Sequence, residues 1–218
     1  MEFEVFPKIA RLSRPFVVTE KIDGTNAQVV VVPEDEGGTI DTPWLASVGG
    51  FLVAAGSRNR FITPAADNHG WAAWVLAHAE EVAMLGPGRH FGEWWGSGIQ
   101  RGYGLPKGEK RFSLFNVSRW ALSGTEPAVI PTGDPSIEKR QQVLPPCCGL
   151  VPVLARGEQF DSQAVDVALA RLSSEGSVAA PGFLKPEGVV VFHVAGNVMF
   201  KKTLEKDDEP KGRVTSHR

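Results

Sequence analysis

The chain has 218 residues, with 23 Lys and Arg against 25 Asp and Glu, so its formal net charge is −2 at pH 7. This near balance excludes a uniformly basic nucleic-acid coat, although it is compatible with a local basic groove. The length is ample for a sizeable core in one large domain or two small ones. Cys147 and Cys148 are adjacent and lack a surrounding Cys/His cluster, which argues against a zinc site and for a reducing compartment.

The N-terminus carries no recognisable targeting signal. Met1 is followed by Glu2-Phe3-Glu4 rather than by a basic and then an apolar stretch, so no signal peptide is predicted. No apolar run reaches membrane-spanning length, and we expect no membrane partner. These features predict a cytoplasmic protein, in a bacterial cell or a phage-infected host.

Short β-branched and aromatic runs recur along the chain and predict strands. The expected strands are Phe16–Thr19, Ala27–Val32, Leu52–Ala55, His90–Trp94, Phe112–Val117, Val189–His193 and Val198–Lys202. Apolar residues at helical spacing predict one helix over Asp67–Leu85, capped by Asp67 or Asn68 and ended by Gly86-Pro87-Gly88. A second helix is predicted over Ser162–Ser173.

The excess of strands over helices predicts an α+β fold with largely antiparallel sheets. Residues 1–204 are expected to form one domain. Thr125–Pro146 is rich in Pro, Gly and charge, which predicts a long loop with room for a short helix. The last segment, Glu205–Arg218, is charged and nearly without large apolar side chains, so we expect a flexible tail.

The most informative stretch is Glu20-Lys21-Ile22-Asp23-Gly24-Thr25-Asn26, between two predicted strands. A lysine that leaves a strand beside an acid, a glycine and small polar residues is an unusual core pattern and suits a covalent nucleophile. Its amine attacks phosphorus only when deprotonated, a state that partial burial or a nearby cation favours. Gly24 would let the backbone come close to a bound nucleotide.

Five further patterns follow in order. They are Ser57-Arg58-Asn59-Arg60, Phe91-Gly92-Glu93-Trp94, Phe112-Ser113-Leu114-Phe115-Asn116, Glu187-Gly188-Val189-Val190 and Met199-Phe200-Lys201-Lys202-Thr203. With the KxDG pattern at Lys21, they resemble the covalent nucleotidyltransferase superfamily of polynucleotide ligases and mRNA capping enzymes. The surroundings of Lys21 look most like the RNA ligases of the RNA-repair, nick-sealing type, in their short phage or bacterial form.

The resemblance implies an ATP-grasp-like nucleotidyltransferase core of two antiparallel sheets flanked by helices, over residues 1–204 and without a C-terminal OB domain. It implies an ATP-dependent RNA ligase that uses Mg²⁺ or Mn²⁺. Lys21 would form lysyl-AMP, AMP would pass to a 5′-phosphate RNA end, and a 3′-hydroxyl end would displace it. Without an OB domain, a protein partner could supply further grip on the RNA.

The resemblance also implies a role for each matching residue. Lys21 is the nucleophile, Lys201 contacts the α-phosphate, Glu187 holds the divalent metal, Arg58 contacts ribose and phosphate, Glu93 accepts from the ribose hydroxyl, Phe115 stacks on adenine, Asn26 lies near the reactive phosphate, and Glu20 lies near the adenine end.

One departure from the family pattern concerns the last lysines. The usual spacing puts two lysines on one strand face, whereas Lys201 and Lys202 are adjacent and must point to opposite faces. Lys201 is favoured for the pocket because Met199 and Thr203 share its face. Lys202 stays the second nucleotide-binding candidate.

Several alternatives remain open. Phe112 competes with Phe115 as the stacking ring, and one of Arg58 and Arg60 is expected to be a plain surface cation. The loop Gln100–Gly104 either touches RNA phosphates or is only a turn. The rival functions are a minimal DNA ligase, a capping-type guanylyltransferase and a non-catalytic RNA end-binding module.

Overall fold

The structure is a computed structural model that describes residues 3–37, 42–122, 124–130, 138–205 and 207. Its internal contacts divide the chain into two compact units. Met1–Lys21 and Pro152–Arg218 form unit 1, and Ile22–Val151 forms unit 2. Lys21 is therefore the last residue before the chain enters unit 2.

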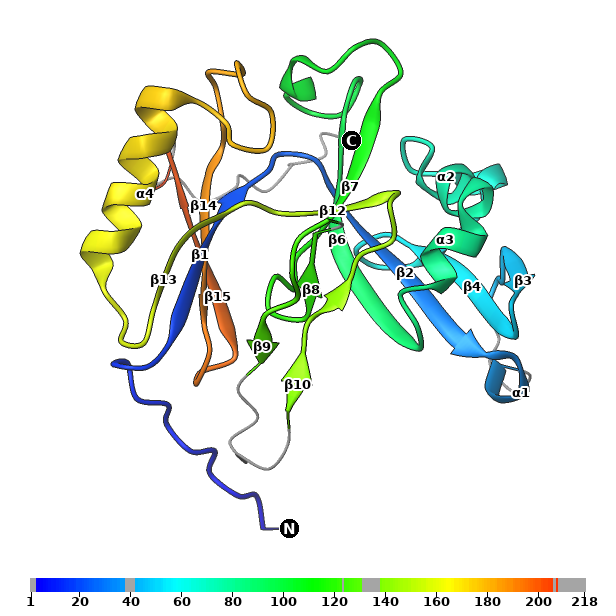
Figure 1. Ribbon diagram of the computed structural model, residues 1–218, viewed down its shortest axis with the longest axis horizontal. Coiled ribbons are helices and arrows are strands. Elements are labelled where there is room, and N and C mark those ends of the chain that lie inside the picture. Colours follow the sequence, from blue (N-terminus) through cyan, green and yellow to red (C-terminus); the bar gives the residue numbers. More distant parts are fainter. Residues whose placement is uncertain (1–2, 38–41, 123, 131–137, 206, 208–218) are drawn as a thin grey trace, which may run out of the picture. The chain divides into compact units, whose positions relative to one another are not determined.

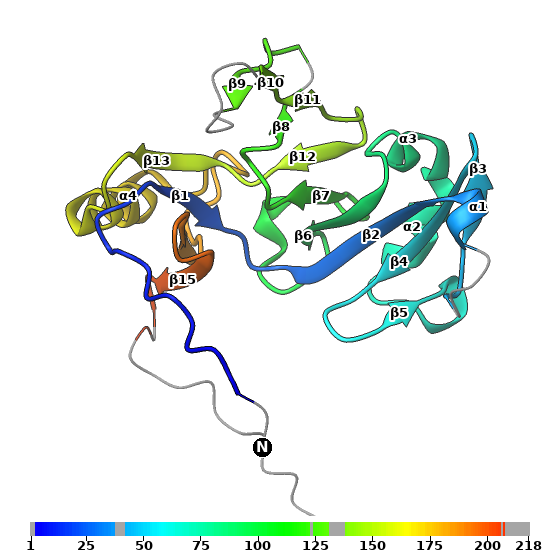
Figure 2. The ribbon, with the colours of Figure 1, turned by 90° about the horizontal axis from the view of Figure 1, so that it is seen from below.

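Unit 1 is built on a four-stranded antiparallel sheet with the order β13-β1-β14-β15 (Figure 1). The strands are β1 (Phe16–Lys21), β13 (Val153–Gly157), β14 (Gly188–His193) and β15 (Val198–Thr203). Helix α4 (Ser162–Glu175) packs against β14 and β13 (Figure 2) and buries Val165, Ala168 and Leu172 in the core of unit 1. Asp161 caps this helix by accepting from the backbone N–H of Gln163 at 2.8 Å.

The register of the unit 1 sheet separates its two faces. Val189, in the core under α4, lies directly opposite both Glu20 and Lys202, so these three side chains share the α4 face. Side chains alternate along a strand, so Lys21 and Lys201 project from the opposite face.

Unit 2 contains a larger sheet with the order β12-β7-β6-β2-β4-β3, and β5 pairs with β4. Its strands are β2 (Thr25–Pro33), β3 (Ala46–Val48), β4 (Phe51–Gly56), β5 (Phe61–Ile62), β6 (Gly88–Gly96), β7 (Lys110–Leu114) and β12 (Cys148–Leu150). The pairings are antiparallel except that β12 runs parallel to β7.

Shorter elements complete unit 2. They are α1 (Glu34–Gly37), the 3-10 helices η1 (Pro64–Ala66) and η2 (Gly102–Gly104), the parallel pair β8 (Trp120–Ala121) and β11 (Gln142–Val143), and the antiparallel pair β9 (Val129–Ile130) and β10 (Lys139–Arg140). The expected loop Thr125–Pro146 therefore holds short strands, and its described residues contain no helix.

Helices α2 (Trp71–Ala77) and α3 (Ala79–Ala83) pack against the unit 2 sheet at β4. Their buried side chains, Trp71, Val75 and Val82, share one core with alternate residues of β2, Val29 and Val31. We call this the inner face of the unit 2 sheet. The other face, which carries the even-numbered residues of β2, is its outer face.

The expected strands are confirmed at β1, β2, β4, β6, β7, β14 and β15, and the helix over Ser162–Ser173 is confirmed as α4. The α+β fold with largely antiparallel sheets is likewise confirmed. Among the described residues, no helix has the length and apolar character that crossing a membrane requires. All but Glu205 and Asp207 of the expected tail lie outside the described residues.

The single helix expected over Asp67–Leu85 is wrong. His78 interrupts it at φ −113° and ψ 23°, where its Nδ1 lies 2.9 Å from the carbonyl oxygen of Trp74. The residue before α2 is Gly70, in a left-handed conformation that glycine adopts without strain. Asp67 still serves the first turn, because its carboxylate accepts from the N–H groups of Ala72 and Ala73.

Candidate active site

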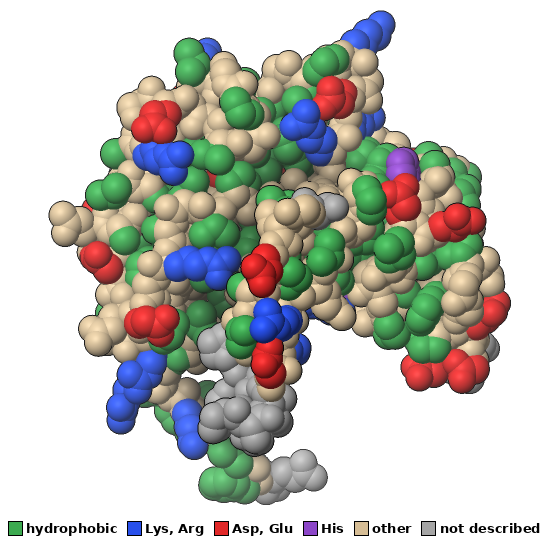
Figure 3. Space-filling view, in the orientation of Figure 1, with side chains coloured by type: hydrophobic (Ala, Val, Ile, Leu, Met, Phe, Trp, Pro, Cys, Tyr) green, Lys and Arg blue, Asp and Glu red, His purple; other side chains and the backbone are tan. Residues whose placement is uncertain are grey.

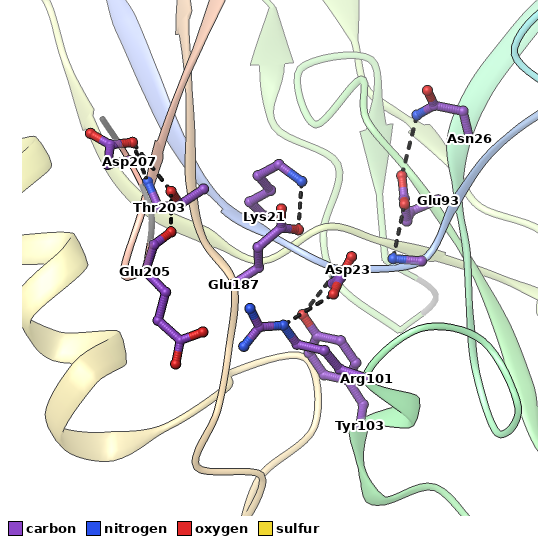
Figure 4. A network of polar contacts seen from close by, with 11 residues as sticks. Lys21, Asp23, Asn26, Glu93, Arg101, Tyr103, Glu187, Thr203, Glu205 and Asp207 are labelled. Carbon is purple, nitrogen blue, oxygen red and sulfur yellow. Dashed lines mark hydrogen bonds and ion pairs between the residues drawn. The ribbon is translucent and has the colours of Figure 1, made fainter. Parts of the chain in front are cut away.

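Lys21 and Glu187 form an ion pair in unit 1. Lys21 ends β1 and Glu187 immediately precedes β14, so the pairing of these strands brings the two residues together across 166 positions of sequence. Figure 4 shows the side chains pointing toward each other, with Nζ 2.5 Å from Oε2. The lysine and glutamate side chains are 22% and 13% exposed, so a ligand can reach the pair. A part-exposed pair adds little to stability, roughly 1 kcal/mol or less.

Glu20 lies on the α4 face and is used differently. It is 1% exposed, and its carboxylate accepts from the Ser177 hydroxyl at 2.5 Å and from the N–H groups of Val178 and Ala179 at 2.8 and 2.9 Å. Three donors satisfy this buried carboxylate within the protein. The structure therefore does not bring Glu20 to the face of Lys21, but uses it to hold the turn that follows α4.

The two adjacent lysines of β15 separate as the strand period requires. Lys202 is on the α4 face and pairs with Asp166 of α4 at 2.7 Å. This hydrogen bond and the negative charge of Asp166 raise the pKa of Lys202. Lys201 is exposed on the face that also carries Lys21. Of the two, only Lys201 shares a sheet face with Lys21.

Three predicted residues meet on the outer face of unit 2. Asn26 of β2 and Glu93 of β6 are register partners, and the Asn26 amide donates to Glu93 Oε2 at 3.4 Å (Figure 4). Arg58, just after β4, donates from Nε to Asn26 Oδ1 at 2.8 Å. Glu93 is buried, and its other oxygen accepts from the Gly24 N–H at 3.0 Å. A buried carboxylate thus orders an amide and a guanidinium at the protein surface.

Gly24 is required by packing within unit 2. A Cβ at this position would lie 2.5 Å from the carbonyl oxygen of Trp94 and 2.8 Å from Cβ of Trp95. The sequence suggested close approach to a nucleotide, whereas the observed close approach is to the backbone of β6. The glycine allows the contact between its N–H and Glu93.

The two candidate stacking rings differ in burial. Phe112 on β7 is buried in the core, with its ring centroid 4.5 Å from that of Trp71. Phe115, just after β7, is only half-buried, and its N–H donates to the carbonyl oxygen of Phe91 at 3.0 Å. Phe115 is therefore the accessible ring of the pair.

Sequence reasoning missed the partners of Asp23. Its carboxylate accepts from Arg101 Nε at 3.0 Å, and its N–H donates to the Tyr103 hydroxyl at 2.8 Å (Figure 4). The loop that was left open between an RNA contact and a turn thus holds the turn at Asp23. The sequence did carry one signal for a structural role of this loop: Tyr103 is the chain's single tyrosine and lies between two glycines.

The described part of the chain offers few protein ligands for a metal. Among the described residues, no group of three or more His, Cys, Asp or Glu is arranged to hold an ion. Cys147 and Cys148 are free thiols with sulfur atoms 3.7 Å apart. The hydrogen bond with Cys147, followed by burial, raises the pKa of the Cys148 thiol, which keeps it protonated.

Comparisons with known proteins bear on this arrangement. A family model described as RNA ligase matches residues 14–203. A search of curated proteins finds no match. Among solved structures, the Naegleria gruberi RNA ligase with PPi is 21% identical with a TM-score of 0.51, covering 91% of this chain and 53% of that one. Two mutants of that ligase with ATP and Mn are also 21% identical with TM-scores of 0.51; one match covers 91% of this chain and 52% of that one, the other 88% and 50%.

The chain therefore spans about half the length of the solved structures that it matches. At this identity the structural likeness shows the fold alone, which is that of the matched half of the Naegleria gruberi RNA ligase. The family match is independent of it and covers the strands that carry both Lys21 and Glu187. By that match, which extends over most of its length, the chain belongs to the RNA ligase family.

Proposed function

We propose that this protein is an ATP-dependent RNA ligase that forms lysyl-AMP on Lys21, adenylylates a 5′-phosphate RNA end and joins it to a 3′-hydroxyl end. The observation that carries the proposal is the accessible Lys21–Glu187 pair, at 2.5 Å, in a chain of the RNA ligase family. The Naegleria gruberi structures that hold ATP and Mn, or PPi, support it, since ATP is the proposed substrate and pyrophosphate the proposed leaving group.

The chemistry begins with a proton. The Lys21 ammonium must lose one before it attacks, and Glu187 Oε2 is within hydrogen-bonding reach to accept it. The amine then bonds to the α-phosphorus of ATP as pyrophosphate leaves. The RNA 5′-phosphate next displaces the lysine nitrogen and takes the adenylyl group. The 3′-hydroxyl finally attacks that 5′-phosphorus, the new phosphodiester forms, and AMP leaves.

The remaining predicted residues take supporting roles in the proposal. Lys201 offsets charge on the α-phosphate, Asn26 lies near the reactive phosphate, Arg58 binds ribose and phosphate, Glu93 accepts from the ribose hydroxyl, and Phe115 stacks on adenine. Glu20 and Lys202 are engaged with residues 177–179 and with Asp166, so we assign them indirect roles.

Mg²⁺ or Mn²⁺ is the proposed metal, and Glu187 is the residue that would hold it. Magnesium usually takes one or two carboxylates together with waters and substrate phosphates, which fits a single accessible carboxylate. When bound, such a cation offsets negative charge on the triphosphate.

We also propose that residues 1–204 act as one adenylation domain, that the substrate RNA arises in repair, and that the protein works in the cytoplasm. A protein partner that adds RNA contacts is part of this proposal.

The test is intact-mass measurement after incubation with ATP and magnesium. We expect one adenylyl group on the wild-type protein and on Lys107→Ala, which removes an exposed lysine elsewhere. Labelling by GTP instead would favour a guanylyltransferase, and no adduct with either nucleotide would favour a non-catalytic module. Sealing of nicks with ribonucleotides, compared with all-DNA nicks, then separates an RNA ligase from a DNA ligase.

A further inference from the structure

Beyond Asn26, the outer face of the unit 2 sheet carries aromatic and basic side chains that the proposed reaction does not use. We infer that this face binds a short single-stranded RNA segment. The inference rests on the proposed function, because it extends from the Asn26–Arg58 contact along β2. We call the set Gln28, Phe61, Arg89 and Phe91 the outer strip.

The register places the outer strip on one face with Asn26. Gln28 lies opposite Phe91 on β6, and Val30 lies opposite Arg89. Phe61 of β5 is on the same side, because its neighbour Ile62 is buried in the core on the inner face. The strip therefore continues the surface that Asn26 and Glu93 begin.

Contacts hold the strip in place. The Gln28 amide donates to the Ser57 carbonyl at 3.2 Å and its oxygen accepts from Arg89 at 3.3 Å. The Arg89 guanidinium carbon lies 5.8 Å from the centroid of the Phe61 ring. Gly56 makes room for this arrangement, since a Cβ there would come within 2.7 Å of Gln28. A binding surface that is already ordered loses less entropy when a ligand binds.

Exposure and charge indicate a nucleic acid. Phe91 is 52% exposed and Phe61 is half-buried, whereas Trp71, Trp94 and Phe112 of the inner face are buried. Arg58, Arg60 and Arg89 are all exposed, and Arg89 lies two positions before Phe91 on the same face of β6. Exposed rings among arginines are the combination that binds single strands, because bases stack on the rings while cations neutralise phosphates.

The strip leads into a small pocket. Its volume is about 220 Å³, and its lining includes Val30, Val32, Trp44, Phe61 and Arg89. The apolar and aromatic walls suit a flat ring. Glu36 of α1 also lines the pocket, and α1 carries Glu34 and Asp35 beside it. Figure 3 shows acidic side chains on this part of unit 2. These carboxylates repel phosphate, so we expect the RNA backbone to turn away from the surface there.

The test is fluorescence anisotropy of the full chain with a labelled single-stranded RNA of mixed sequence. Phe61→Ala and Phe91→Ala should each weaken binding by about 5- to 150-fold, the effect of losing one stacked base. Arg89→Ala should reduce the slope of log affinity against log salt by about 0.7, the value for one phosphate contact. Phe91→Trp should bind the RNA about as tightly as the wild type does, since a base can stack on either aromatic ring.

Matched controls are Arg171→Ala and Met84→Ala, which remove an exposed arginine from α4 and an exposed apolar side chain just after α3, both outside the strip. The inference fails if the strip variants bind RNA like these controls. A wild-type protein that binds RNA through the strip but forms no adduct with ATP would overturn the proposed ligase and not the strip. If the wild-type protein forms the adduct with ATP but Phe61→Ala and Phe91→Ala bind RNA as well as the wild type does, the strip would be overturned and the proposed ligase would stand.

Discussion

The two faces of the unit 1 sheet use charged side chains in opposite ways. On the α4 face, Glu20 is buried with three donors and Lys202 pairs with Asp166. Lys21 projects from the opposite face and contacts Glu187, which precedes β14. The contrast lies in the two carboxylates: three protein donors satisfy the buried Glu20, which stabilises the fold, whereas Glu187 stays part-exposed and available to a ligand.

The largest effect is expected from substitution of Lys21. Lys21→Ala should abolish the adenylyl adduct in intact-mass measurement, because no other amine replaces the nucleophile. Lys21→Arg should abolish it too, since a guanidinium can keep the ion pair but does not deprotonate in proteins. Both variants should unfold within about 1 kcal/mol of wild type in urea. An adduct on either variant would refute the assignment.

A substitution at Glu187 tests the other member of the Lys21–Glu187 ion pair. Glu187→Ala should slow adenylylation by about 100-fold and remove its response to magnesium, because the variant lacks both the proton acceptor and the proposed metal ligand. The measurement is the initial rate of adduct formation across a magnesium titration. A wild-type rate with an unchanged magnesium response would rule out the role.

Glu20 tests the other face. Glu20→Ala should lower the free energy of unfolding by about 3 kcal/mol, because the Ser177 hydroxyl and two backbone N–H groups lose their acceptor. Glu20→Gln should cost less, since one oxygen acceptor remains. Urea unfolding followed by tryptophan fluorescence measures both. Equal urea midpoints for the wild type and Glu20→Ala would show that Glu20 does not stabilise the fold, and would contradict the contrast drawn with Glu187.

The smallest effect is expected from the two neighbouring lysines. Lys201→Ala should lower the rate of adduct formation by about tenfold, as expected for loss of one cation near a developing negative charge. Lys202→Ala should lower it less, because this side chain contacts Asp166 of α4. The paired comparison controls for net charge. A larger loss of rate in Lys202→Ala than in Lys201→Ala would reverse the roles that we assign to the two lysines.

Much of the fold was predictable because its central strands are rich in β-branched residues. The run Val29–Val32 on β2 and Val189–Val191 on β14 are clear examples. By contrast, β13 was missed, since Val153–Gly157 contains Ala, Arg and Gly and has no such signal. The break at His78 depends on its ring contacting Trp74, which helical periodicity does not report.

The candidate site could be proposed from residue types, but the contacts of its residues could not. The sequence singled out Lys21 and Glu187 separately, and their pairing depends on β1 lying beside β14. It also indicated that Lys201 and Lys202 point apart, but which of them faces α4 follows from the tertiary packing. Asp23 and its contacts with Arg101 and Tyr103 required the fold itself.

Gly24 sets a different requirement from the lysine three positions before it. Any side chain here would force β2 away from β6 and separate the backbone from Glu93. If Lys21 has the proposed role, a descendant without that activity could exchange it, yet its folding would still demand glycine at position 24. Retention of this glycine in a divergent sequence would therefore report an intact sheet and would not by itself indicate the proposed activity.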